Sequence, residues 1–148
     1  MPTQPHPDFG QWLTYAESVR SDTARRKGLS NVPSSQEYQN MVAVYQNLYV
    51  PICQRFGKLF VSSFFRSVAV NRAVGGAKKS QHMGGFAIDI DCDGTRTVAN
   101  LQLYNWIVAT LNFDQIILEY PDAQGRPSWV HCSFVSREKN RKQQITVT

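Results

Sequence analysis

The sequence predicts an α+β fold, in which an antiparallel sheet has helices packed on one of its faces. Helix-start patterns occur in the first half of the chain, where Thr14 and Ser34 are each followed by a glutamate three residues later. Short segments that alternate apolar and polar residues occur in the second half, as expected of strands with one buried face. No linker or repeat interrupts the 148 residues, a length typical of one domain.

Composition excludes several classes of protein. Hydrophobic residues make up 42% of the chain and charged residues 18%, which is globular and not disordered. The apolar runs are too short to cross a bilayer, so no membrane insertion is expected. The N-terminus has no basic segment followed by an apolar stretch, so no signal peptide is predicted. The three cysteines (Cys53, Cys92 and Cys132) lack CxxC spacing, which favours free core thiols over disulfides or a thiolate metal site.

The net charge of +5 suggests an anionic partner: cell wall, nucleic acid or a membrane surface. Its basic clusters, at 25–27, 78–79 and 137–142, are of a kind that is usually solvated, so charge alone selects no partner. A nucleic-acid-binding domain would need aromatic residues interleaved with Lys and Arg on one face. The clusters flank loops and a tail instead, and we therefore expect no nucleic-acid partner.

The first half of the chain is expected to be mainly helical. Residues 1–8 hold three prolines and should form an irregular arm. A short helix should follow Thr14, and a longer one should run from Ser34 to Gly57, kinked or broken near its end by Pro51. The apolar face of the longer helix should consist of Met41, Val44, Tyr45, Leu48 and Ile52.

The second half is expected to hold four strands and one helix. The strands are rich in β-branched and aromatic residues and cover 59–65, 86–91, 115–120 and 128–134. A loop with one helical turn should span 66–85, and Asp93-Gly94 should form a turn. A helix over 98–111 should face inward with Leu101, Tyr104, Val108 and Leu111. Residues 137–148 form a basic, polar tail that is expected to fray.

Three of the strands carry reactive side chains opposite their apolar residues. Because side chains alternate along a strand, Asp89 and Asp91 share the face opposite Ile88 and Ile90. Glu119 likewise lies opposite an expected apolar face of Ile116, Leu118 and Tyr120. His131 lies opposite Val130, Cys132 and Phe134. A sheet with one core side and one open side would gather these groups into one cleft, with His82 in the loop at its edge.

Two imidazoles and one carboxylate are a ligand set that Zn²⁺ accepts while a fourth position stays open for water. From the residues alone the set is His82, His131 and either Asp89 or Asp91, because the two aspartates face the same way. An open position is typical of catalytic zinc sites. The residues therefore suggest a metal-dependent hydrolase.

The same residues follow a family pattern. The first part of the pattern, Ser-x-His-x-x-Gly-x-Ala-x-Asp, is matched by Ser80, His82, Gly85, Ala87 and Asp89. The second part is a Trp-x-His strand, which is matched by Trp129 and His131. Upstream of both motifs, the segment 62–76 is similar to the Ser-Gly-Tyr-Arg-Ser segment of the same family. From about Phe9 to Phe134 the chain resembles the zinc D-alanyl-D-alanine carboxypeptidase family. These are peptidoglycan peptidases of the Hedgehog/DD-peptidase fold, and the resemblance is to their small single-domain phage and bacterial members.

The resemblance implies one Zn²⁺ per chain, bound by His82, Asp89 and His131 in a peptidase domain over residues 9–136. It implies a monomer that hydrolyses peptidoglycan stem peptides as a DD- or LD-carboxypeptidase or endopeptidase. The absent signal peptide would suit a protein that is cytoplasmic at synthesis and reaches the wall as a phage lysin or in a virion. A non-catalytic wall-binding or structural module on the same fold is the alternative.

The resemblance also suggests roles for residues around the metal. Arg66 would stabilise the oxyanion or bind a substrate carboxylate, while Ser80 and Trp129 would contact the substrate. Simpler interpretations are a surface ion pair for Arg66 and packing for Trp129. Phe64 departs from the family, which usually has glycine there.

A second departure concerns the general base. Ser128 lies three residues before the last zinc-binding histidine, where many members of the family have an acid. We expect Glu119 to act as the base instead, because it is on the neighbouring strand and faces the same way. Asp91 is the rival, and a solvated carboxylate is the simpler interpretation of Glu119.

Overall fold

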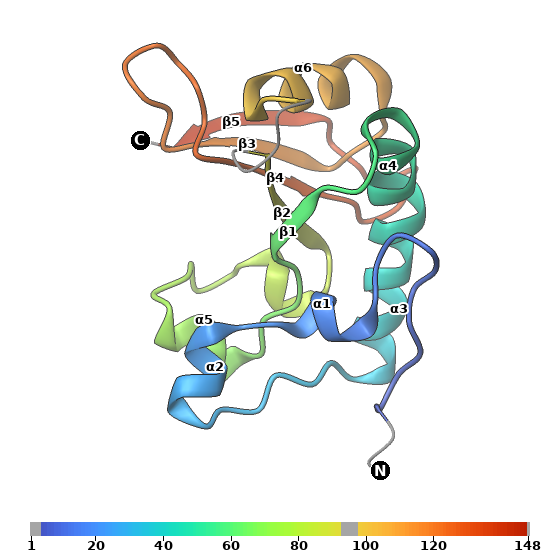
Figure 1. Ribbon diagram of the computed structural model, residues 1–148, viewed down its shortest axis with the longest axis vertical. Coiled ribbons are helices and arrows are strands. Elements are labelled where there is room, and N and C mark those ends of the chain that lie inside the picture. The colour runs from blue at the N-terminus through green and yellow to red at the C-terminus, as the bar shows by residue number, and fades with distance from the viewer. Residues whose placement is uncertain (1–3, 93–97, 148) are drawn as a thin grey trace.

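A five-stranded sheet with the order β1-β2-β4-β3-β5 forms the centre of the computed structural model, which describes residues 4–92 and 98–147 (Figure 1). The strands are β1 (Phe60–Ser63), β2 (Ala87–Asp91), β3 (Gln115–Glu119), β4 (Trp129–Ser133) and β5 (Gln143–Val147). Neighbouring strands are antiparallel except β3 and β5, which are parallel. The predicted α+β class is confirmed. The turn expected at Asp93-Gly94 lies outside the described residues.

A long helical run packs against one face of the sheet (Figure 1). It consists of α3 (Ser35–Val44), the π-helical segment η1 (Tyr45–Tyr49) and α4 (Val50–Phe56). Pro51 was expected to kink or break this run, and the break is wrong because helical turns continue through Pro51 to Phe56. Pro51 lies in the first turn of α4, directly after the π-helical turn, where the changed hydrogen-bond pattern tolerates its missing N–H. Gly57 ends the run at a positive φ of 82°, as expected of a helix-ending glycine.

The apolar face predicted for this run is confirmed. Its five residues are at most 5% exposed and belong to the main core: Met41, Val44, Tyr45, Leu48 and Ile52. They meet the sheet residues Ile88, Ile90, Ile116, Val130 and Cys132 in the same cluster. One face of the sheet is thus sealed by apolar packing, which leaves the other face to carry polar groups.

Four short helical segments complete the N-terminal and middle parts of the chain: α1 (Tyr15–Val19), α2 (Asp22–Lys27), α5 (Val68–Ala73) and the 3₁₀ turn η2 (Gln81–Gly84). The predicted capping box at Thr14 begins α1. The sequence patterns did not predict α2 or η2. None of the helices in the described ranges has the length and apolar character needed to span a membrane.

The inward face predicted for α6 (Asn100–Thr110) is only partly right, because Tyr104, Val108 and Leu111 pack against the core without forming the most buried face. Leu103 and Ile107 are fully buried, whereas the expected residues Leu101, Tyr104, Val108 and Leu111 are only partly buried. Asn100 accounts for the rotation. Its buried side chain accepts a hydrogen bond from the Cys92 amide and donates to the carbonyl oxygens of Pro127 and Ser128. These bonds fix the helix start, and α6 is apolar enough that periodicity alone did not select its inner face.

The C-terminal segment was predicted to fray, and this prediction is wrong because the segment contains β5. Arg141 leads into this strand and forms an ion pair with the buried carboxylate of Asp114 at 2.8 Å. The Gln143 amide then donates to the Asp114 carbonyl oxygen at 2.9 Å. Polar residues predominate in β5 because it is an edge strand, whose stability comes from backbone pairing with β3.

The three cysteines are buried and none of them forms a disulfide in the described part of the chain, as the sequence predicts. Cys53 lies in α4, Cys132 on β4 and Cys92 just after β2. Burial raises the pKa of the Cys53 and Cys132 thiols, so both stay protonated at neutral pH. Their role is core packing, and they contribute nothing to the cleft described below.

Candidate active site

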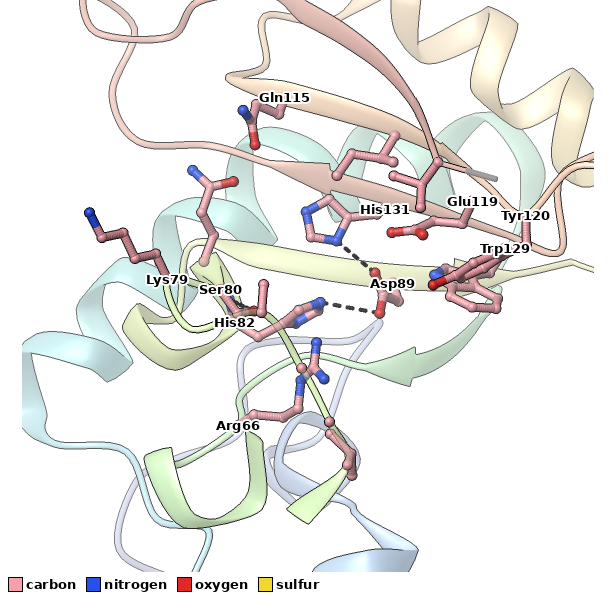
Figure 2. Close-up of a pocket in the computed structure, with 17 residues that line it drawn as sticks. Arg66, Lys79, Ser80, His82, Asp89, Gln115, Glu119, Tyr120, Trp129 and His131 are labelled. Atoms are coloured by element: carbon pink, nitrogen blue, oxygen red, sulfur yellow. Dashed lines mark hydrogen bonds and ion pairs between the residues drawn. The ribbon is translucent and has the colours of Figure 1, made fainter. Parts of the chain in front are cut away.

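Sheet register brings Asp89 and His131 together on the face opposite the core. Asp89 of β2 is directly opposite His131 of β4, and Ile117 of β3 is opposite His131 on its other side. The turn η2 supplies His82 from the edge of the sheet (Figure 2). The three residues are at most 8% exposed, and one potential ligand atom from each lies within 4.8 Å of the others.

Asp89 is the centre of this group. Its Oδ1 lies 3.0 Å from His131 Nδ1, and its Oδ2 lies 3.1 Å from His82 Nε2 (Figure 2). Burial alone would raise the pKa of the Asp89 carboxyl, but the two histidines outweigh burial and hold the pKa below its usual range. The carboxylate is therefore ionised at neutral pH.

His82 is oriented by the backbone. Its Nδ1 lies 2.6 Å from the carbonyl oxygen of Phe64, and only a protonated Nδ1 donates a hydrogen bond to a carbonyl. The neutral ring then has its lone pair on Nε2, the atom that faces Asp89. A carbonyl partner of this kind is typical of histidines that bind metals.

The donor set fits a divalent metal. His82 Nε2 is buried and has no hydrogen-bond partner among the described residues, because its approach to Asp89 Oδ2 is close in distance but poorly aligned. A lone pair buried without a donor is costly, and a cation between the three side chains would satisfy it. Two imidazoles and one carboxylate are suitable ligands for zinc.

Asp91, the alternative ligand, does not join this group. It lies at the end of β2, opposite Phe60, and its carboxylate accepts a hydrogen bond from the Asn100 side chain at 3.1 Å. It is also not among the residues that line the cleft over the candidate metal site. The Asn100 contact thus distinguishes two aspartates that alternation placed on one face.

Glu119 lines the same cleft, at the end of β3 and opposite Trp129 of β4. Its side chain points toward the Asp89 and His131 pair (Figure 2). Burial raises the pKa of its carboxyl and Asp89 adds to the rise, while His131 and Arg66 oppose it. A carboxylate with a raised pKa is a better base near neutral pH.

Arg66 lies on another side of the cleft. Its Nε is buried and has no hydrogen-bond partner among the described residues. Burial lowers the pKa of its guanidinium, and the charges of Asp89 and Glu119 oppose this effect. The Arg66 amide also donates to the His82 carbonyl oxygen at 3.2 Å, so this segment helps to hold the turn η2 that carries His82.

The remaining residues predicted for the site also line the cleft. Ser80 caps η2, and its hydroxyl accepts a hydrogen bond from the His82 amide at 3.3 Å. Trp129 is partly buried, and its Nε1 has no partner among the described residues. Ser128, at the position where the family often has its base, donates from its hydroxyl to the Tyr120 carbonyl oxygen instead.

The cleft, of about 500 Å³, includes residues that sequence reasoning missed. Tyr120 lines it, although alternation along β3 put Tyr120 on the core face with Ile116 and Leu118. A φ of 45° at Tyr120 breaks the alternation and turns the side chain outward, where it is 52% exposed. Val147 of β5 also contributes to the wall. Neither position had a sequence pattern that would reveal it.

Comparison with known protein families agrees with this geometry. The family model described as Peptidase M15 matches residues 11–133. This stretch contains Glu119 and the candidate metal group, by which we mean His82, Asp89 and His131. No curated protein matches the chain closely enough to show a relationship. Because the family match covers most of the chain, the chain belongs to the peptidase M15 family and is a metal-dependent peptidase of the kind that acts on peptidoglycan.

Proposed function

We propose that the protein is a zinc-dependent peptidase that hydrolyses peptide bonds in peptidoglycan stem peptides. The observation that carries the proposal is the buried group of His82, Asp89 and His131 at the base of a cleft that also contains Glu119. The carboxylate and the orphaned Nε2 of His82 are suited to hold Zn²⁺. When bound, Zn²⁺ supplies Lewis acidity that lowers the pKa of water to about 7 and polarises a carbonyl group.

Glu119 is the general base in this proposal. Its carboxylate takes a proton from the attacking water and passes that proton to the leaving amine. Support comes from its position in the cleft and from the raised pKa of its carboxyl, which favours both accepting and returning a proton. Ser128 has no comparable basicity and is already bonded to Tyr120.

Arg66, Ser80 and Trp129 bind the substrate in this proposal. The guanidinium of Arg66 has an unpaired buried Nε, so it is suited to donate to a developing oxyanion or to a substrate carboxylate. Ser80 would donate from its hydroxyl, which otherwise only accepts from His82. Trp129 offers a partly buried ring beside Glu119.

The resemblance to small phage and bacterial peptidases suggests where the protein acts. A net charge of +5 suits an anionic cell wall and would draw the protein to it. We propose a phage lysin as the leading setting. A non-catalytic wall-binding module with the same metal site is the competing function.

Digestion of purified peptidoglycan tests the proposal. The zinc-loaded protein should release peptide fragments, and a chelator should abolish the release until zinc is restored. Mass spectrometry of the products identifies the cleaved bond. A protein that carries zinc and sediments with peptidoglycan but releases no fragments would instead be the wall-binding module.

A further inference from the structure

The cleft has one aromatic end. Tyr120 and Trp129 lie beside Glu119, whereas Lys79 lies at the opposite end (Figure 2). The two rings are in contact, with centroids 5.5 Å apart and planes inclined by 53°. Ile117 and Val147 also line the cleft, and Val147 pairs with Glu119 across β3 and β5. Among the described residues that line the cleft, none of the lysines or arginines belongs to β3, β4 or β5.

Tyr120 is held in this position by its backbone. Its φ of 45° is a conformation that residues with side chains rarely adopt. The Tyr120 amide donates to the Val147 carbonyl oxygen at 2.7 Å, and the Ser128 hydroxyl donates to the Tyr120 carbonyl oxygen at 3.1 Å. The surrounding chain therefore maintains an unfavourable backbone conformation. Such strain is concentrated where a side chain must point in a particular direction.

The result is an exposed aromatic ring with no packing role in the core. Tyr120 is 52% exposed, and alternation along β3 would otherwise have buried it with Ile116. Turning a tyrosine out of the core loses apolar burial, so the conformation is not explained by stability. The conformation places the ring on the wall of the cleft, where a ligand would meet it.

The position of Glu119 indicates which part of a ligand meets the rings. Glu119 precedes Tyr120 in the chain and is paired with Trp129 across the sheet. If Glu119 returns a proton to the leaving amine, the residue that contributes this amine lies beside Glu119 and therefore against the two rings. A wall of aromatic and aliphatic groups next to a carboxylate favours an uncharged, apolar side chain and disfavours another carboxylate.

We propose that Tyr120 and Trp129 form a specificity wall for the leaving-group residue of the substrate and select an apolar side chain there. This inference rests on the proposed peptidase function. The Val147 carbonyl oxygen and the Ser128 hydroxyl position the wall through their bonds to the Tyr120 backbone, so the C-terminal strand β5 takes part in substrate selection.

Two stem peptides test the wall, once the cleaved bond has been identified. They are identical except for the residue on the amine side of that bond, which is D-leucine in one and D-aspartate in the other. The wild-type enzyme should prefer the D-leucine peptide in kcat/KM by about tenfold, as expected for one apolar contact. Tyr120→Ala should bring the ratio close to parity, mainly by raising KM for the D-leucine peptide. Tyr120→Phe keeps the ring and should keep the preference.

Phe60→Ala is the matched control. Phe60 is 53% exposed, nearly the same as Tyr120, but lies on β1 and does not line the cleft. It should leave the preference unchanged. An active wild-type enzyme whose preference persists in Tyr120→Ala, or disappears equally in Phe60→Ala, would overturn the wall alone. Zinc-loaded wild-type protein that cleaves neither these peptides nor peptidoglycan would overturn the proposed function itself.

Discussion

Asp89 and His131 occupy directly opposite positions on β2 and β4, and their Oδ1 and Nδ1 atoms are 3.0 Å apart. Opposite residues of antiparallel strands always share a face, so the pairing of these strands itself brings together two of the three residues that could hold a metal ion. A slip of one residue would turn one of the two side chains into the core. Only His82 depends on a turn, and that turn is held by the backbone of the segment after β1.

The first prediction concerns the metal ligands. His82→Ala and His131→Ala should each lose most of the bound zinc, because each removes one imidazole and leaves too few ligands for tight binding. Metal analysis of the purified, dialysed variants measures this. The third histidine of the chain, His6, is the control. It stacks on Tyr38 outside the cleft, so His6→Ala should keep its zinc. Full zinc content in both ligand variants would refute the assignment.

The second prediction separates the base from the ligands. Glu119→Gln should lower the rate of peptidoglycan hydrolysis by about 10²–10⁴-fold and leave the zinc content intact, because the amide cannot accept the proton. Asp91→Asn should leave both the rate and the zinc content near the wild-type values, since Asp91 does not line the cleft. Zinc analysis and hydrolysis assays on the same samples distinguish the two carboxylates.

Glu138→Gln provides the control for charge removal, because Glu138 is exposed in the segment before β5. It should behave as the wild type. Near-normal hydrolysis by Glu119→Gln together with loss in Asp91→Asn would mean that the wrong carboxylate has been named. Loss of zinc in Glu119→Gln would instead make Glu119 a ligand.

Sequence reasoning predicted that Asp89 and His131 face the same cleft because strand alternation is a local property. The side chains of Asp89 and His131 face the cleft as their apolar neighbours Ile88 and Val130 require. Alternation could not choose between Asp89 and Asp91, because residues two apart on a strand point to the same face of the sheet. That choice depends on the Asn100 side chain, which binds Asp91 from the first residue of α6.

What the sequence did not predict depends on backbone contacts between distant segments. The Phe64 carbonyl oxygen that orients His82 carries no side-chain identity. The positive φ of Tyr120 could not be predicted, because tyrosine rarely adopts it. The Tyr120 amide donates a hydrogen bond to the Val147 carbonyl oxygen, which belongs to a segment expected to fray. The polar composition of β5 favoured a tail because an edge strand is stabilised by its partner and not by an apolar face of its own.

The last prediction concerns Asp114, which attaches the C-terminal segment to the rest of the fold. Asp114 is only 1% exposed. Its carboxylate accepts hydrogen bonds from the Arg141 guanidinium, the Arg141 amide and the Gln81 side chain. Asp114→Asn loses these charge-assisted bonds and should lower the free energy of unfolding by about 1–3 kcal/mol in urea at pH 7. Asp122→Asn is the control, because Asp122 pairs with Arg126 at the exposed surface and should leave the urea midpoint nearly unchanged.

The pH dependence tests the physical reason for this loss. The hydrogen bonds from Arg141 are the main cause that holds the pKa of the Asp114 carboxyl below its usual value, and burial opposes them. A lowered folded-state pKa adds stability that is fully present above the unfolded pKa of about 3.9 and is lost as the pH falls through the folded-state pKa. The difference between wild type and Asp114→Asn should therefore be constant from about pH 5 to 7 and shrink as the pH falls below about 4. A difference that stays the same at low pH would show that the asparagine disturbs packing, and that the ion pair with Arg141 is not what anchors β5.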